Sequence, residues 1–283
     1  MNRGGRRFYS RKSSLSSFFL GSAIAGAASF SLFPSALVYA DGDQAPVTTY
    51  PWSHKGIFSS FDHASIRRGY QVYKEVCASC HSMNRLAYRH LVDISHTVDQ
   101  AKAEAAAVNV VDGPNDEGNM FTRPGKLTDY FPDPYPNKEA ARFANGGAYP
   151  PDLSLMAKAR PKGIDYIFSL ITGYSEPPAG IEIKGNLHFN KYFPGGAISM
   201  AQNLYDGIVE YEDGTPATAS QMAKDVCTFL AWSASPELEE RKQMMMKAFI
   251  VCSALTGLVF YIKRHRWSYL KSRQFVYKPN SKI

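Results

Sequence analysis

The sequence predicts a mainly α-helical protein, in which a loop-rich helical domain is followed by one transmembrane helix near the C-terminus. Two observations predict this fold class. Apolar residues recur at helical spacing in several short stretches of the middle of the chain. Further on, the 19-residue run 244–262 carries Lys247 as its only charge. At the helical rise of 1.5 Å per residue this run is about 28 Å long, enough to cross the hydrocarbon core of a bilayer.

Four stretches of the middle region predict helices. The first has apolar side chains at positions 66, 70, 72, 73 and 76, and the second is rich in alanine. The four expected helices cover residues 67–80, 99–107, 163–172 and 220–232. Two intervening segments, 112–137 and 173–216, are dense in Pro, Gly, Asn and Asp, which predicts loops and turns. With 45% hydrophobic and 13% aromatic residues, the chain can fill a core around these elements.

The run 244–262 could also be a buried core helix instead of a membrane span. Only 21 residues follow Ile262, too few to surround such a helix, and they begin with the basic sequence Lys263-Arg264-His265-Arg266. Basic residues that flank a span mark the matrix or cytoplasmic face of a membrane. A single span with the domain on the opposite side is therefore the favoured interpretation.

The N-terminus is typical of a targeting sequence. Residues 1–17 are rich in Arg and Ser and hold no acid, and an apolar stretch follows to Tyr39, with the small residue Ala40 before Asp41. This pattern predicts a bipartite mitochondrial presequence that directs the mature protein to the intermembrane side. A bacterial secretory signal with a long basic region is the alternative, and it delivers the domain to the same topological side.

The charges are segregated along the chain. Five bases and no acid fall in 1–40, and ten bases and no acid fall in 241–283. The middle segment holds all 25 acids against 17 bases, so its formal charge is −8 although the whole chain carries +7. The basic average therefore does not indicate nucleic-acid binding. The predicted division is a presequence over 1–40, a domain over 41–240, an anchor helix over 241–263 and a basic tail over 264–283.

The sequence Cys77-Ala78-Ser79-Cys80-His81 predicts a covalently attached c-type haem. Two thiols separated by two residues can add to the two vinyl groups of a porphyrin, and the adjacent imidazole then serves as an axial iron ligand. A thioredoxin-like dithiol would need a βαβ context, and a zinc site would need a second pair of ligands. The other cysteines, Cys227 and Cys252, are isolated, so neither rival nor a disulfide framework is favoured.

Spacing alone leaves several candidates for the second axial ligand. Histidine with methionine gives the higher potentials of respiratory cytochromes c, so each methionine is a candidate. Met83 is too close to His81, and others lie in the leader or the span, which leaves Met120, Met156, Met200 and Met222. Two of these lie on apolar helical faces, whereas Met200 follows the turn Pro194-Gly195-Gly196. Met200 is favoured, and His188 or His96 could compete.

Longer motifs resemble one family over residues 49–279. They are the segments YPWSHKG (50–56), SIRRG (65–69), RPGKL (123–127), YPPDLS (149–154), YFPGGAI (192–198), DGTPAT (213–218) and KSR (271–273). In these segments the chain closely resembles the cytochrome c1 family, the haem subunit of the mitochondrial quinol–cytochrome c reductase, also called the cytochrome bc1 complex.

This resemblance implies a cytochrome c-like, loop-rich helical haem domain in the intermembrane space, held by one pass through the mitochondrial inner membrane, with the C-terminus in the matrix. It implies one haem c, attached through Cys77 and Cys80, with His81 and Met200 as iron ligands. Arg160 matches an arginine that pairs with a haem propionate, and Asn145 and Tyr166 match residues near the same propionates.

The implied function is electron transfer inside an enzyme complex, without a substrate-converting site in this chain. Electrons would pass from a Rieske iron–sulfur protein to soluble basic cytochrome c, and the other partners would be cytochrome b, an acidic hinge-type subunit, other small subunits and the lipid bilayer. Four acids are candidates for docking cytochrome c, namely Glu104, Asp112, Asp116 and Glu117. The alternatives are a haem enzyme or gas sensor with an open iron site, and a structural anchor within a larger complex.

Overall fold

The computed structural model of the protein describes residues 44–183 and 185–274. The helices are α2 (His63–Val72), α3 (Val98–Ala106), α4 (Lys138–Ala144), α5 (Met156–Ala159), α6 (Ile164–Thr172), α7 (Ala219–Ser233) and α8 (Leu238–Ser272), with the shorter helical turns η1 (Ser53–Lys55), η2 (Tyr73–Cys77) and η3 (Tyr88–Leu91). The strands form two antiparallel pairs, β1 (Asn109–Asp112) with β2 (Phe121–Pro124) and β3 (His188–Phe189) with β4 (Ala197–Ile198). This confirms the predicted mainly α fold, and α8 is the one helix among the described residues that is long and apolar enough to cross a membrane.

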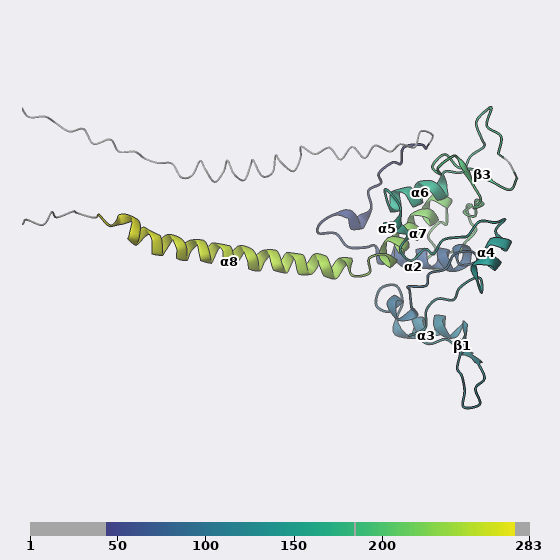
Figure 1. Cartoon of the computed structure of the whole chain (residues 1–283), viewed down its shortest axis with the longest axis horizontal. Helices are drawn as coiled ribbons and strands as arrows, with labels where there is room; N and C mark the ends of the chain where they lie inside the picture. The colour runs from purple at the N-terminus through teal and green to yellow at the C-terminus, as the bar shows by residue number, and fades with distance from the viewer. Residues whose placement is uncertain (1–43, 184, 275–283) are drawn as a thin grey trace, which may run out of the picture. The chain divides into compact units, whose positions relative to one another are not determined.

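The core of the domain is built where α2 and α7 cross (Figure 1). Asp62 caps the start of α2 by accepting from the backbone N–H of Ser65 at 3.2 Å, and Thr218 caps α7 in the same way by accepting from Gln221 at 3.2 Å. The two helices bury side chains that have almost no exposed surface. They include Ile66, Tyr70, Val72, Met222, Phe229 and Trp232. Burial of these apolar and aromatic groups is the main stabilising contribution to the domain.

Gly69 lets the two helices approach closely. A Cβ atom at this position would lie 2.1 Å from the backbone oxygen of Asp225 and 2.8 Å from Cβ of Phe229. Because neither is a flexible side-chain end, a larger residue would have to push α2 and α7 apart.

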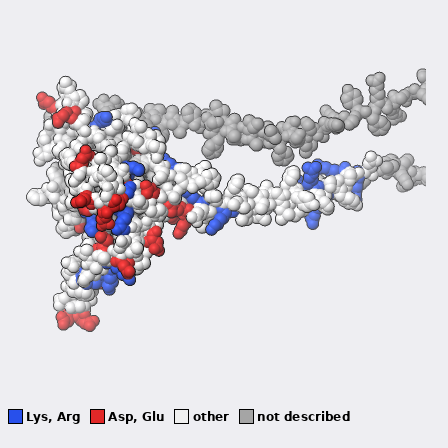
Figure 2. All heavy atoms as spheres, turned by 180° about the vertical axis from the view of Figure 1, so that it is seen from behind, with Lys and Arg blue, Asp and Glu red and all other residues white. Residues whose placement is uncertain are grey.

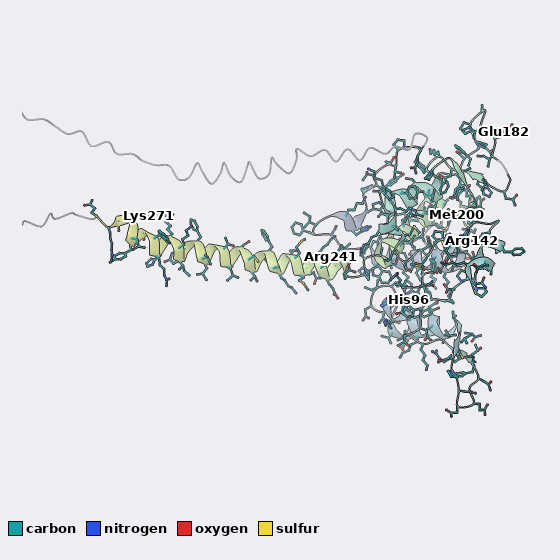
Figure 3. The ribbon with its side chains drawn as sticks, in the orientation of Figure 1. His96, Arg142, Glu182, Met200, Arg241 and Lys271 are labelled. Atoms are coloured by element: carbon teal, nitrogen blue, oxygen red, sulfur yellow. The ribbon has the colours of Figure 1, made fainter. Side chains whose placement is uncertain are left out.

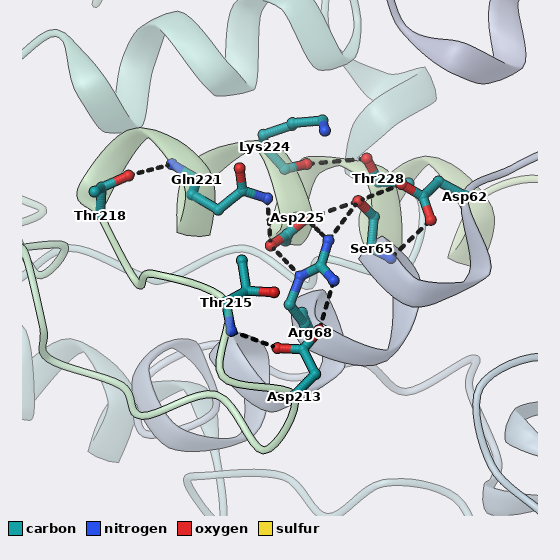
Figure 4. A network of polar contacts seen from close by, with 10 residues as sticks. All are labelled: Asp62, Ser65, Arg68, Asp213, Thr215, Thr218, Gln221, Lys224, Asp225 and Thr228. Carbon is teal, nitrogen blue, oxygen red and sulfur yellow. Dashed lines mark hydrogen bonds and ion pairs between the residues drawn. The ribbon is translucent and has the colours of Figure 1, made fainter.

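Beside this crossing, a buried polar network links the same two helices (Figure 4). The carboxylate of Asp225 has no exposed surface and accepts from Arg68 at 2.9 Å, Ser65 at 2.7 Å and Gln221 at 3.0 Å. Arg68 also donates to Asp213 at 2.8 Å, in the loop before α7. Asp225 and Asp213 raise the pKa of the guanidinium, so the charge of Arg68 is fixed and compensated.

Most differences from the sequence-based expectation concern short elements. The stretch predicted as one helix over 67–80 is α2 followed by the π-helical turn η2, and α8 continues to Ser272 beyond the predicted end of the anchor. The strand pairs lie inside the two segments predicted as loops, and α4 and α5 were not anticipated, because elements of two to seven residues carry too little periodicity. The predicted presequence lies outside the described residues.

The segment before α2 is fastened to the first turns of α8. Lys242 Nζ donates to the backbone carbonyls of His54, Gly56 and Ser59, each at 2.7 Å. Glu239 accepts from the backbone N–H of Phe61 at 2.7 Å. An ammonium with three carbonyl acceptors is fully satisfied, so these contacts hold the start of α8 on the domain.

Acid should weaken this junction through His54. Its ring is buried 4.6 Å from the ring of Phe61, and burial, Lys242 and Lys55 lower its pKa from the ordinary value of 6.5 to about 4. Between these two values the unfolded chain binds a proton that the folded chain does not, so stability falls as the pH is lowered through this window. We expect the chain to lose about 3 kcal/mol more than a His54→Phe variant from pH 7 to pH 4. Denaturant unfolding of both proteins in detergent measures this difference, and parallel pH profiles would contradict the assignment.

Candidate haem site

The Cys77–His81 segment turns sharply at the end of η2, which continues α2. The backbone N–H of Ala78 donates to Tyr73 at 2.8 Å, which widens the last helical turn into η2, and the N–H groups of Cys80 and His81 both donate to the carbonyl of Cys77. π-Helical turns of this kind are frequent at functional sites. The turn presents two thiols and an imidazole from one short loop.

His81 is held in one orientation by a backbone carbonyl. Its Nδ1 lies 2.8 Å from the oxygen of Pro151, and Tyr73 Oη donates to the carbonyl of His81 at 3.1 Å. An imidazole that donates from Nδ1 keeps Nε2 as its free lone pair, which is the usual arrangement of a metal-ligating histidine.

The carbonyl of Pro151 is positioned by the segment that follows it. Asp152 accepts from Ser82 Oγ at 3.1 Å and from the backbone N–H of Asn84 at 2.8 Å. Leu153 N–H donates to the carbonyl of Ser82 at 2.9 Å. These contacts align residues 151–154 with residues 81–85, so the motif YPPDLS serves to orient the histidine.

Cys77 does not have the character of a redox-active thiolate. Cys77 and Cys80 are not joined in a disulfide, and burial raises the pKa of Cys77 to about 12, which keeps the thiol protonated. In the part of the chain that the structure describes, no group of three or more His, Cys, Asp or Glu side chains could hold a metal ion. The residues present fit a porphyrin with two thioether links and one imidazole ligand better than either rival.

A short chain of side chains leads from the motif to Asn145. Tyr135 Oη lies 3.8 Å from Cys80 Sγ, and Asn145 Nδ2, at the end of α4, donates to Tyr135 Oη at 3.1 Å. Arg160 ends α5 with an exposed side chain, and its charge is close enough to lower the pKa of the buried Tyr166, although burial raises that pKa by more. Among the described residues, no hydrogen bond joins Arg160 to Tyr166 or Asn145, so their shared role stays a prediction.

Met200 follows β4 in a loop that is tied to α6. Asn190 is fully buried and donates to the carbonyl of Leu170 at the end of α6 at 2.7 Å. Tyr174, just after α6, donates from Oη to the carbonyl of Met200 at 2.9 Å. Met200 is half-buried, and its backbone carbonyl is held by Tyr174.

The competing ligands are less suitable. Met222 is completely buried in α7 and Met156 packs against the core, as expected for methionines on apolar helical faces. Met120 is 63% exposed in the loop between β1 and β2. His188 is exposed, and His96 packs edge-on against Tyr70. Figure 3 shows Met200 on the β3 side of the domain and His96 on the α3 side.

Sequence reasoning did not identify Pro151, Tyr73, Tyr135 or Tyr174 as contributors. Each acts through a backbone carbonyl or a phenolic oxygen, and such roles have no spacing signal in a single sequence. Only the motif that contains Pro151 was conspicuous, as part of a family resemblance.

A model of the Cytochrome C1 family matches residues 52–270, which are more than half of the chain. The chain belongs to the cytochrome c1 family. Among curated proteins, it is 59% identical over 257 residues to cytochrome c1 2, heme protein, mitochondrial, of Arabidopsis thaliana, covering 91% of this chain and 83% of that protein. It is 57% identical over 231 residues to the yeast cytochrome c1, heme protein, of Saccharomyces cerevisiae, covering 81% and 75%. A protein of Candida albicans named cytochrome b-c1 complex catalytic subunit, mitochondrial, is 57% identical over 234 residues, covering 82% and 81%.

Proposed function

We propose that this cytochrome c1 family member is the electron-transfer subunit of a mitochondrial quinol–cytochrome c reductase. It takes electrons from a Rieske iron–sulfur protein and delivers them to soluble cytochrome c. The observation that carries the proposal is the Cys77–His81 turn, with His81 oriented by Pro151, in a chain whose relatives are named as heme proteins and as a subunit of the cytochrome b-c1 complex.

Cys77 and Cys80 would bind one haem c through thioether bonds, and His81 Nε2 and Met200 Sδ would be the axial ligands. When bound with both axial positions filled, the haem supplies one-electron transfer without binding oxygen. Arg160 would compensate propionate charge, and Asn145 and Tyr166 would lie at the same edge. The protein would keep the two iron ligands in the same positions before and after electron transfer. The fixed orientation of His81 and the hydrogen-bonded loop of Met200 favour this.

The proposed location is the mitochondrial inner membrane, with residues 1–40 as a cleaved presequence. The domain 41–240 lies in the intermembrane space, 241–263 crosses the membrane once and 264–283 form the matrix tail. Figure 2 shows a largely uncharged surface along α8 with Lys and Arg gathered toward its C-terminal end, and α8 is apolar enough to span a membrane, which supports this orientation. One span with Lys247 as the only charge within 244–262 offers no quinone site of its own, so we assign quinol oxidation to partners such as cytochrome b, the Rieske protein and the small subunits, including an acidic hinge-type subunit.

The acids predicted to dock cytochrome c fall into two classes. Glu104 pairs with Lys74 at 2.7 Å, and Asp112 pairs with Arg123, so neighbouring bases compensate both charges. Asp116 and Glu117 are exposed in the loop between β1 and β2, at the acidic tip visible in Figure 2. The uncompensated pair is the better candidate for attracting a basic protein.

Reduction of soluble cytochrome c by the assembled complex should slow as ionic strength rises, because salt screens the attraction between acidic and basic surfaces. In an Asp116→Asn/Glu117→Gln variant we expect a smaller dependence on salt. Glu182→Gln is the control, since Glu182 is an exposed acid on a different loop (Figure 3). Stopped-flow rates with quinol as donor measure the slopes, and a flat response in the unmodified complex would contradict acidic docking.

Two other functions make different predictions. A haem enzyme or gas sensor requires an iron position that Met200 leaves open, and a structural anchor requires that turnover of the complex survive loss of the haem iron. The tied loop of Met200 favours electron transfer over the first, and the family membership favours it over the second.

A further inference from the structure

Two large apolar side chains stand exposed on a turn beside the start of α8. Ile57 is 65% exposed and Phe58 is 81% exposed. They are the central residues of a turn closed by Ser59, whose N–H donates to the carbonyl of Gly56 at 3.4 Å and whose hydroxyl donates to the same oxygen at 3.0 Å. Such positions normally hold Gly, Pro, Asn, Asp or Ser. Within the described residues these two side chains contribute little to the core, so their apolar character points to a partner outside the domain.

Contacts with α8 fix the position of this turn along the axis of that helix. Lys242 donates to both ends of the turn, at the carbonyls of Gly56 and Ser59, each at 2.7 Å. Glu239, three residues earlier and therefore on the same helical face, accepts from Phe61. The apolar run 244–262, in which Lys247 is the only charge, begins at Met244, about 3 Å further along the helix axis than Lys242. The turn is thus held at the level where the charged start of α8 gives way to its apolar part.

We infer that Ile57 and Phe58 insert into the interfacial layer of the bilayer and form a second membrane contact beside the span. This inference rests on the proposed span of α8. Aromatic side chains are enriched at this depth, and the acidic and basic side chains of the first turns of α8 would lie among the headgroups. Two side chains on a tight turn are far smaller than a protein interface, which typically buries about 800 Å² on each partner, so lipid is the occupant that fits. With the span, this contact fixes the tilt of the haem domain over the membrane.

A nitroxide label at position 58 tests the depth directly. The full-length chain with Cys252→Ser and Phe58→Cys is loaded with haem, labelled and placed in phosphatidylcholine nanodiscs, and the collision rates with oxygen and with a water-soluble nickel complex are compared. The Cys252 substitution is needed because that thiol is exposed on α8, whereas Cys227 is buried. Oxygen concentrates in lipid, so the ratio of the two rates reports immersion.

Two further labels serve as references. Phe143→Cys replaces a phenylalanine that is 92% exposed on α4, and Leu258→Cys lies inside the proposed span. We expect the ratio at position 58 to be several-fold higher than at 143. The inference is overturned if the ratio at 58 equals that at 143, or if the label at 58 is shielded from both reagents. In either case, a lipid-like ratio at 258 leaves the proposed span intact. A water-like ratio at 258 overturns the span and the inference with it.

Discussion

A Gly69→Ala variant is expected to lose the folded haem domain. In an isolated helix this change stabilises by about 1 kcal/mol, because glycine has the larger backbone entropy. Here the added Cβ would lie 2.1 Å from the backbone oxygen of Asp225 and 2.6 Å from its carbonyl carbon, so α2 and α7 would have to separate. We expect the packing loss to exceed the helix gain and to leave a net destabilisation of at least about 3 kcal/mol.

Gly257→Ala is the matched control, since Gly257 is also inside a helix but has no atom within 4 Å of an added Cβ. Near-ultraviolet circular dichroism of the detergent-solubilised chains reports the packing of the buried aromatic residues. The control should unfold at the same denaturant concentration as the unmodified chain or slightly higher. Equal unfolding midpoints for Gly69→Ala and the unmodified chain would show that the helices do not touch as described.

Asp225→Asn is expected to destabilise the domain by about 3–5 kcal/mol, because it leaves the charge of Arg68 without its buried partner. The carboxylate of Asp225 is fully buried and accepts from three side chains, whereas an amide can accept with only one of its two terminal atoms. The side chain of Arg68 is 13% exposed and cannot regain the lost interaction from water.

Asp213→Asn removes the other carboxylate of Arg68 and is the control. The side chain of Asp213 is 44% exposed, so its loss should cost less than about 1 kcal/mol. A double variant, Arg68→Met/Asp225→Leu, should recover much of the lost stability, since an apolar pair can replace a buried ion pair. Denaturant unfolding of the unmodified chain, of the single variants Arg68→Met and Asp225→Leu, and of the double variant measures the coupling, and additive single effects would argue against a direct interaction.

Long periodic patterns and one short motif predicted much of the molecule. The helices over 99–107, 163–172 and 220–232 correspond to α3, α6 and α7 within one or two residues, because each buries a face long enough to show its period. The apolar run 244–262 lies inside α8. By contrast, η2 interrupts the helix predicted over 67–80, and its i→i−5 hydrogen bond depends on the haem-motif turn that follows.

The sequence predicted the ligands of the site but not the residues that orient them. The motif itself identifies Cys77, Cys80 and His81, because their chemistry depends on spacing along the chain. Pro151 orients His81 from 70 residues away through a carbonyl, and that contact follows from the pairing of residues 151–154 with 81–85. Such tertiary support carries no local pattern, so only the folded chain reveals it.

The absorption spectrum of the oxidised chain tests the central claim most directly, because a thioether ligand to haem iron gives a weak band at the red end of the visible spectrum. We expect the unmodified, haem-loaded chain and Met120→Ala to show this band. Met200→Ala should lose it and have a lower reduction potential, since methionine ligation raises the potential. A band that survives in Met200→Ala, or that is absent from the unmodified chain, would contradict the assignment of Met200 and with it the electron-carrier account.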